Sequence, residues 1–342
     1  RAARGFLGGG RRPPADSSPR PVAPAKPALE RARDHRMRIQ LSPDGPLDVP
    51  QTLARYRIWG EDPSNRLGAG VFRRVLALDG KLHGYAVRWA GPPDDARIMI
   101  SVPGSRSTRV AEAVSGEVGR LLFLDADVLG FYRAAKSDAV LQGLIAPFYG
   151  MRPTLAPTPF EMLVGAVTAQ QVNLAFAVTT RGRLVRRFGR PVQVEGERLY
   201  AFPAPETLAK AKVRDLRRMQ FSTRKAEYII GLARLVARGE LDFGRLATCP
   251  NEQVIAELTR IRGFGRWTAE WFLARALGRG DVCPAGDLAV RKCFAQFYGR
   301  GRALSERAIR RRAAGWGPHQ NLAIHYLLAG LRQLRAKAGG GA

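Results

Sequence analysis

The sequence predicts a mainly α-helical protein with a small α+β domain in its N-terminal third. Between residues 37 and 125, β-rich runs bounded by turn residues alternate with two helical segments. From residue 126 to residue 337 the pattern is helical throughout. With 342 residues, 45% of them hydrophobic, the chain is long enough to bury a core in each part.

The first 36 residues differ from the rest in composition. They are rich in Arg, Pro, Ala and Gly and show little apolar periodicity, which predicts a disordered basic tail. Asp16, Glu30 and Asp34 argue against a transit peptide, and the segment contains no secretory hydrophobic region.

The predicted α+β domain, 37–125, begins with a strand and a helix. Asp79-Gly80 separates two later strand-like runs and is a favoured hairpin turn. An amphipathic helix at Thr108–Leu122 closes the domain. The other predicted elements are a strand at Met37–Leu41, a helix at Val49–Trp59, and strands at Val71–Leu78, Lys81–Trp89 and Arg97–Val102.

The helical part contains two adjacent glutamines in an unusual setting. A long apolar helix is predicted to start at Pro159-Phe160-Glu161 and to run from Met162 to Ala175, with Gln170 and Gln171 inside it. Buried amides need hydrogen-bond partners. Either the glutamines cap a buried helix end, or another molecule supplies their partners.

A glycine-rich turn interrupts the helical pattern of residues 251–277. The run Arg262-Gly263-Phe264-Gly265-Arg266 separates a helix that begins at Asn251 from one that runs from Trp267 to Ala276. Two glycines around one apolar residue allow a tight hairpin that approaches another molecule closely. The unpaired N–H groups of the second helix favour a phosphate beyond the hairpin. Asp287 follows, at the predicted start of another helix at Leu288.

The stretch Ile261-x-Gly263-Phe264-Gly265-Arg266-Trp267-Thr268-Ala269, with Asp287 after it, resembles the helix-hairpin-helix motif and trailing aspartate of the HhH-GPD superfamily of DNA glycosylases. Bifunctional members carry a lysine where this chain has Trp267. An indole has no amine that could form a Schiff base with the sugar. The resemblance therefore points to the monofunctional alkyladenine (3-methyladenine type II) branch. It implies a helical HhH-GPD glycosylase fold preceded by an N-terminal α+β sheet domain.

The resemblance also implies a role for particular residues. Asp287 would stabilise a cationic sugar and orient or deprotonate the attacking water, unless it only caps the helix at Leu288. Gln171 would be the wedge that fills the gap left by the extruded base. The expected base pocket comprises Trp267, Trp271, Tyr326 and Phe160, with core packing as the alternative for the tryptophans. The expected DNA contacts are Gln170, Gln171, Gly263, Phe264, Gly265, Arg266, Thr268 and Lys225, whose charge is otherwise part of a solvated face.

Few cofactors are expected. The resemblance implies that the backbone carbonyls of Ile261 and Phe264 hold a structural Na⁺ or K⁺, and that no other cofactor is required. The three cysteines cannot supply the four ligands of the iron–sulfur cluster that some relatives carry. His319 and His325 lack a metal-ligand pattern, and we interpret them as surface or pocket-edge residues.

The charge of the chain favours a polyanionic partner. Lys and Arg number 56 against 29 Asp and Glu, a net charge of +27, which suits duplex DNA. GC-rich coding is another source of an arginine-rich composition. No apolar run approaches the ~20 residues that span a bilayer. The three cysteines form no CxxC pair and no zinc-binding spacing, which favours a reducing compartment. We therefore expect a cytoplasmic protein, associated with the nucleoid if its source is bacterial. We also expect it to be a monomer and to make no membrane contact.

The leading hypothesis is a monofunctional DNA glycosylase that flips and excises alkylated purines of the 3-methyladenine type in base-excision repair. Indole faces suit a base that carries positive charge. Two alternatives remain open. One is a glycosylase of the same fold that acts on deaminated or oxidised bases, and the other is a non-catalytic helix-hairpin-helix DNA-binding protein. The chain departs from the best-studied branch at two positions, because Leu288 and Leu328 stand where that branch has aromatic residues. These departures bear on the range of substrates and not on the type of reaction.

Overall fold

The β-rich runs form a five-stranded antiparallel sheet with the order β1-β5-β4-β3-β2. The computed structural model describes residues 36–339. Asp79 and Gly80 both have positive φ, 50° and 73°, as the predicted β3–β4 hairpin turn requires. The strand β2 was not predicted from the sequence. The strands are β1 (Arg36–Leu41), β2 (Asn65–Gly68), β3 (Val71–Leu78), β4 (Lys81–Ala90) and β5 (Arg97–Pro103).

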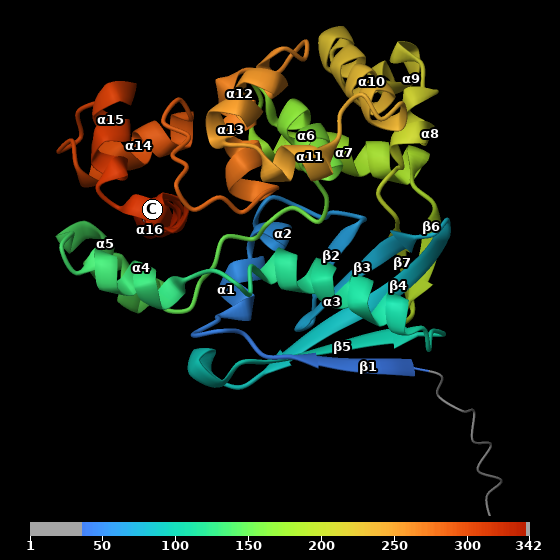
Figure 1. Ribbon diagram of the computed structural model, residues 1–342, viewed down its shortest axis with the longest axis horizontal. Helices are drawn as coiled ribbons and strands as arrows, with labels where there is room; N and C mark the ends of the chain where they lie inside the picture. The colour runs from blue at the N-terminus through green and yellow to red at the C-terminus, as the bar shows by residue number, and fades with distance from the viewer. Residues whose placement is uncertain (1–35, 340–342) are drawn as a thin grey trace, which may run out of the picture. The chain divides into compact units, whose positions relative to one another are not determined.

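The amphipathic helix α3 (Thr108–Leu122) covers one face of this sheet (Figure 1). Its buried residues Val114 and Leu121 share a core with Tyr85 and Ile100 of the strands. The predicted helix at Val49–Trp59 is divided at Ala54 into α1 (Val49–Leu53) and α2 (Arg55–Ile58). A short 3₁₀ turn, η1 (Pro93–Asp95), precedes β5.

The remainder of the chain is built on two further cores. One gathers around α6, α10, α12 and α13, and the other around α4, α5, α14 and α16. Trp271 packs against both cores and so lies at the seam between them. The elements are α4 (Val128–Ala135), α5 (Ala139–Ile145), η2 (Ala146–Phe148), α6 (Pro159–Ala169), α7 (Leu174–Phe188), α8 (Pro205–Ala209), α9 (Val213–Arg217), α10 (Thr223–Ala237), α11 (Phe243–Thr248), α12 (Asn251–Thr259), α13 (Arg266–Arg275), α14 (Leu288–Phe297), α15 (Glu306–Ala314), η3 (Gly317–His319) and α16 (Gln320–Gly339).

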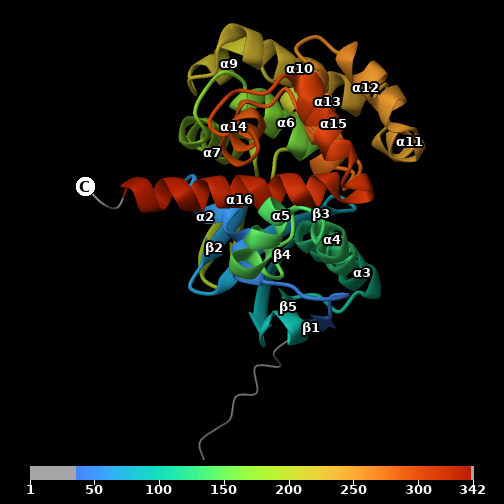
Figure 2. The same cartoon turned by 90° about the vertical axis from the view of Figure 1, so that its left-hand side faces the viewer.

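The helix α16 runs as one long segment, with α14 and α15 on one side and α4 and α5 on the other (Figure 2). Its contacts with α14 and α5 make it the spine of the second core. None of the helices in residues 36–339 combines the length and the apolar character needed to cross a bilayer.

The prediction that the chain is helical throughout after residue 126 is wrong at one place. Residues 191–200 form a hairpin of β6 (Pro191–Val194) and β7 (Glu197–Tyr200). These strands are too short to show a clear alternation of side chains, which is why the sequence did not reveal them. Glu195, at the turn, contacts Arg88 at 2.6 Å and accepts a hydrogen bond from Ser101 at 3.1 Å. The hairpin therefore packs onto the five-stranded sheet.

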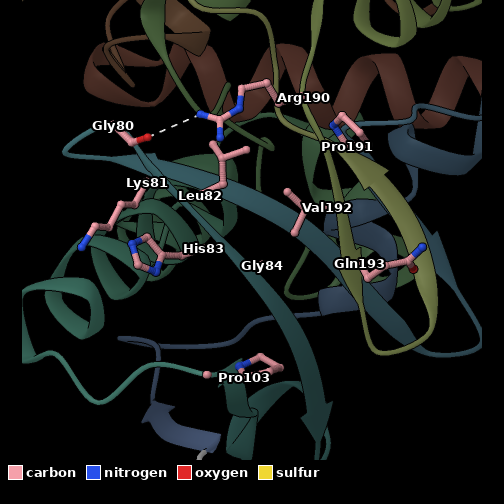
Figure 3. Close-up of a pocket in the computed structure, with 11 residues that line it drawn as sticks. Gly80, Lys81, Leu82, His83, Gly84, Pro103, Arg190, Pro191, Val192 and Gln193 are labelled. Carbon is pink, nitrogen blue, oxygen red and sulfur yellow. Dashed lines mark hydrogen bonds between the residues drawn. The ribbon is translucent and has the colours of Figure 1, made fainter.

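A cavity of about 540 Å³ lies where this hairpin meets β4 (Figure 3). Leu82 and Val192 line it, and Arg190 donates a hydrogen bond to the Gly80 carbonyl at its edge. Its lining residues all come from 80–84, 103–104 and 190–193. None belongs to the elements that carry Asp287, so this cavity is separate from the predicted catalytic site.

The predicted long helix from Met162 to Ala175 is also wrong, because it is broken at the two glutamines. The helix α6 ends at Ala169, Gln171 has a φ of +55°, and Asn173 starts α7 by accepting a hydrogen bond from the Phe176 amide at 2.8 Å. Asparagine is a favoured N-cap. Apolar periodicity on both sides of the break hid it from the sequence analysis.

A buried network of charges joins the sheet to α6. Arg74 of β3 contacts Glu161 of α6 at 2.8 Å and Glu117 of α3 at 2.9 Å. Burial works to lower the pKa of Arg74, but the carboxylates of Glu161 and Glu117 raise it well above its ordinary value. Arg181 of α7 also contacts Glu161, at 2.5 Å. The predicted division at residue 125 remains a prediction, and these contacts cross it.

Candidate active site

The hairpin between α12 and α13 depends on Gly263. Its φ of +91° is unfavourable for any residue with a Cβ, and a Cβ there would overlap three ring carbons of Tyr228. Phe264 is buried, and its amide donates to the Ile261 carbonyl at 3.0 Å, which anchors the turn in the core. A Cβ on Gly265 would meet no described atom within 4 Å. The hairpin therefore shows an open backbone surface at Gly265 and a packed one at Gly263.

The N-terminus of α13 has the features of an anion site. Its N-cap residue, Gly265, provides no side-chain hydrogen bond, and the first turn contains no acidic residue. Its leading amides are thus left for an outside acceptor. Arg266, in this turn, contacts Glu252 at 3.0 Å and Glu270 at 2.9 Å, and these carboxylates raise the pKa of Arg266. A phosphate would share that guanidinium with two existing ion pairs.

Asp287 receives four N–H donors. As the N-cap of α14 its Oδ1 accepts from the amides of Ala289 at 2.8 Å and Val290 at 3.1 Å. Its Oδ2 accepts from the indole Nε1 of Trp267 at 2.7 Å and of Trp271 at 3.1 Å. The two tryptophans lie one turn apart on α13, so both indoles reach the same oxygen. The structure brings the predicted catalytic aspartate and both tryptophans together, and Asp287 also caps its helix.

The surroundings of this cluster are open on one side. Trp267, Trp271 and Asp287 are all partly exposed, and Leu288 beside the aspartate is 66% exposed. On the inner side the ring of His325 stands edge-on to Trp271, with 5.8 Å between the ring centroids. The sequence analysis interpreted His325 as a surface or pocket-edge residue, and its ring lies at the edge of this cluster.

The predicted wedge and the hairpin lie side by side. Gln171 is exposed at the break between α6 and α7, while Gln170 donates from Nε2 to the Gly263 carbonyl at 2.9 Å. Lys225 donates from Nζ to the Thr168 carbonyl at 2.9 Å, and burial lowers its pKa. Gln170 and Lys225 therefore support the protein's own backbone, so the partner predicted for Gln170 need not be DNA.

Four predicted site residues have their side chains in the core, namely Phe264, described above, Phe160, Tyr326 and Thr268. Phe160 is 5% exposed and packs on Phe202, and Tyr326 is 0% exposed and hydrogen bonds to the Tyr132 hydroxyl at 2.8 Å. Thr268 is 1% exposed. Phe160 and Tyr326 do not line an open pocket, and Thr268 does not present its side chain to DNA. Each of these three was assigned from its place in a motif, but helical geometry turns it toward the interior.

The two carbonyls predicted to bind a cation fit that role in chemistry. The Ile261 carbonyl uses one lone pair for the Phe264 amide and keeps another. Backbone carbonyls are hard oxygen ligands of the kind that Na⁺ and K⁺ accept. The cation itself remains a prediction.

A glycine hairpin that leads into an uncapped helix, followed by an aspartate held against that helix, defines the helix-hairpin-helix class of protein. The model of the family described as HhH-GPD superfamily base excision DNA repair protein matches residues 164–319. The chain is also 34% identical over 204 residues to the DNA-3-methyladenine glycosylase of Bacillus subtilis, across 60% of this chain and 67% of that protein. The chain belongs to the HhH-GPD superfamily.

Solved structures show the same relationship. The 3-methyladenine DNA-glycosylase from Archaeoglobus fulgidus has a TM-score of 0.76 and 29% identity, covering 86% of this chain and 97% of that one. The Schizosaccharomyces pombe 3-methyladenine DNA glycosylase Mag1, in complex with abasic DNA, has a TM-score of 0.50 and 25% identity, covering 58% and 94%. Alignments with the Bacillus subtilis relatives span about two thirds of their length.

Proposed function

We propose that this protein is a monofunctional DNA glycosylase that extrudes alkylated purines of the 3-methyladenine type from duplex DNA and excises them hydrolytically in base-excision repair. One observation carries the proposal: Asp287 accepts hydrogen bonds from the indoles of Trp267 and Trp271, on the helix that starts at the hairpin. The names of the similar Bacillus and Archaeoglobus proteins support the substrate class.

The DNA is held by the hairpin and opened by the wedge. The amides at Gly265 and after it bind the phosphate beside the target nucleotide. Extrusion costs a few kcal/mol, and Gln171 offsets it by filling the vacated space. The charge of +27 strengthens binding along the duplex. The protein works as a monomer, in the cytoplasm with the nucleoid if its source is bacterial.

The chemistry needs negative charge more than it needs an acid. A purine alkylated at N3 or N7 is already a cationic leaving group, so no general acid is required. Positive charge develops on the sugar as the bond breaks, and the Asp287 carboxylate stabilises it. Indole faces attract the cationic base by about 0.5–2 kcal/mol.

The hydrogen bonds of Asp287 favour this electrostatic role over proton transfer. A carboxylate has about four lone-pair sites, and four N–H donors already occupy those of Asp287. To deprotonate water, Asp287 would first have to release a donor. The fixed donors orient the carboxylate, and they do so without any motion during the reaction.

Two further features belong to the proposal. The carbonyls of Ile261 and Phe264 would hold Na⁺ or K⁺, which would fix the hairpin and add positive charge near the phosphate. Lyase chemistry is not expected, since Trp267 has no amine and the Lys225 ammonium is engaged with the Thr168 carbonyl.

The test is Asp287→Asn, which removes the charge but keeps an N-cap of the same shape. We expect release of free base from methylated duplex DNA to slow by on the order of 10²–10³-fold, while binding to an abasic duplex persists. Asp242→Asn is the matched control, because Asp242 caps α11 through the Arg245 amide away from the site. If Asp287→Asn releases base at the wild-type rate, the catalytic assignment of Asp287 fails. If the wild-type protein binds the duplex but releases no base, the non-catalytic alternative stands.

A further inference from the structure

One face of α16 opens toward the tryptophans. Between residues 321 and 331 every residue is buried except His325 and Leu328, which are partly exposed. These two lie three residues apart and therefore share a face of the helix. The His325 ring packs edge-on against Trp271, and Trp271 donates a hydrogen bond to Asp287. This face of α16 therefore forms part of the wall of the proposed base pocket.

His325 has a fixed tautomer. Its Nδ1 lies 2.8 Å from the Asn321 carbonyl oxygen. A carbonyl can only accept, so Nδ1 carries the proton and Nε2 holds a lone pair. That Nε2 is buried and finds no hydrogen-bond partner among the described residues. A buried unpaired polar atom in a native structure requires an explanation.

The imidazole stays neutral near physiological pH. Burial lowers the pKa of His325 to about 4, and the hydrogen bond to the Asn321 carbonyl opposes that shift only in part. The charged groups that act on it, Arg332 and Arg55, lower its pKa further. A cationic base in the pocket would act in the same direction. Nε2 is therefore a permanent acceptor.

The neighbouring side chain presents an acceptor too. Asn321 donates from Nδ2 to the Ala274 carbonyl at 2.8 Å, which fixes the orientation of its amide, and its buried Oδ1 has no partner among the described residues. Both unpaired atoms on α16 are thus acceptors. Asn321 itself is buried, so at the pocket wall it is Nε2 of His325 that suits a guest with an N–H donor.

We propose that His325 is a specificity-determining residue that accepts a hydrogen bond through Nε2 from the exocyclic amino group of the extruded purine. The inference rests on the proposed glycosylase function and narrows it to amino-bearing bases, alkylated adenine and guanine. Hypoxanthine has neither amino group: it carries an oxygen at C6, where adenine has its amino group, and a hydrogen at C2, where guanine has its amino group. At either position it offers Nε2 no amino donor, which leaves Nε2 unpaired.

The inference is tested with three 7-methylpurines, two of which differ from the third, 7-methylhypoxanthine, in a single group each. Duplexes carry 7-methylguanine, 7-methyladenine or 7-methylhypoxanthine, all cationic, of which the last has no amino group. Single-turnover release rates are measured with spontaneous loss subtracted. We expect the wild-type protein to release at least one amino-bearing base about tenfold faster than 7-methylhypoxanthine.

Variants then assign the preference to His325. His325→Leu replaces the imidazole with an apolar side chain that has no acceptor and that suits a helix. It should bring the release rates of the three bases within about twofold of each other. His325→Gln can turn an amide N–H toward the carbonyl and should shift the preference toward 7-methylhypoxanthine. His319→Leu, the same change on η3, should leave the preference intact.

The controls separate three results. Binding to a duplex with a tetrahydrofuran abasic site involves no base, so His325→Leu should bind it with wild-type affinity. Equal wild-type rates, or a preference that survives in His325→Leu, overturns the inference alone. A wild-type protein that releases none of the three bases overturns the proposed function instead.

Discussion

Substitution by alanine should affect a different property at each glycine of the hairpin: stability at Gly263 and DNA binding at Gly265. Gly263→Ala places a methyl group inside the ring of Tyr228 on a backbone with a φ of +91°. Gly265→Ala adds a methyl group that meets no described atom within 4 Å, on a backbone with an ordinary φ of −114°. We expect the first to impair folding and the second to impair only DNA binding.

The magnitudes follow from the two environments. A Cβ at positive φ costs about 1–2 kcal/mol, and overpacking against a ring costs about 1–3 kcal/mol. Gly263→Ala should therefore lower the free energy of unfolding by roughly 2–5 kcal/mol, a large share of the ~5–15 kcal/mol of a typical domain. Gly265→Ala should change it by no more than about 0.5 kcal/mol.

Urea unfolding measures the stability, and fluorescence anisotropy with an abasic duplex measures the affinity. Gly265→Ala should bind roughly tenfold more weakly or worse, because its methyl group occupies the space of the phosphate. In the double variant Tyr228→Ala/Gly263→Ala the ring is gone, so only the backbone strain of Gly263→Ala should remain. Wild-type stability in Gly263→Ala, or wild-type affinity in Gly265→Ala, would refute this account of the hairpin.

Three further outcomes are expected. Trp271→Phe removes one donor from Asp287 and should slow base release about tenfold; a faster reaction in single turnover would indicate that Asp287 is a proton acceptor held back by that bond. Gln171→Ala should slow release about tenfold from duplex but not from single-stranded methylated DNA, and an equal effect on both would exclude the wedge role. Burial works to raise the pKa of Asp62, but Arg181 and neighbouring hydrogen bonds hold it below the unfolded value of 3.8. The stabilisation that Asp62 contributes is therefore complete above pH 3.8 and is lost as the pH falls through the lower pKa of the folded state. Asp62→Asn should therefore reduce the fall of the free energy of unfolding at acid pH, measured by urea titrations. An unchanged fall would contradict this.

The site was predictable where one short segment carries all the chemistry. The structure places Gly263 and Gly265 in a hairpin and Asp287 at the start of a helix, as the sequence predicted, because both are local features. Their roles in binding and catalysis remain predictions. The break at Gln171 was not predictable, because the apolar period continues on both sides of it. The side-chain partner of Gln170 is distant in the sequence, and nothing local announces it.

Residues assigned only by their place in a motif were less secure. Thr268 follows Trp267 directly, yet one position on a helix turns a side chain by about 100°, which moves it from the site into the core. Tyr326 was predicted to line the pocket but is buried, whereas His325, one position before it, lies beside Trp271. The direction of a side chain on a helix depends on which partner the helix packs against, and that is a property of the tertiary structure.

The ion pair between Arg74 and Glu161 has a mechanical consequence. Glu161 stands in the first turn of α6, and Gln171 lies just beyond its last. In the proposed reaction, a force on Gln171 would pass along α6 to the Glu161–Arg74 ion pair and from there into the five-stranded sheet. The sheet would then support the segment that carries Gln171 against displacement. A fragment without the sheet would keep Arg181 of α7 as a partner of Glu161 but would lose Arg74, and with it the ion pair that joins α6 to the strands.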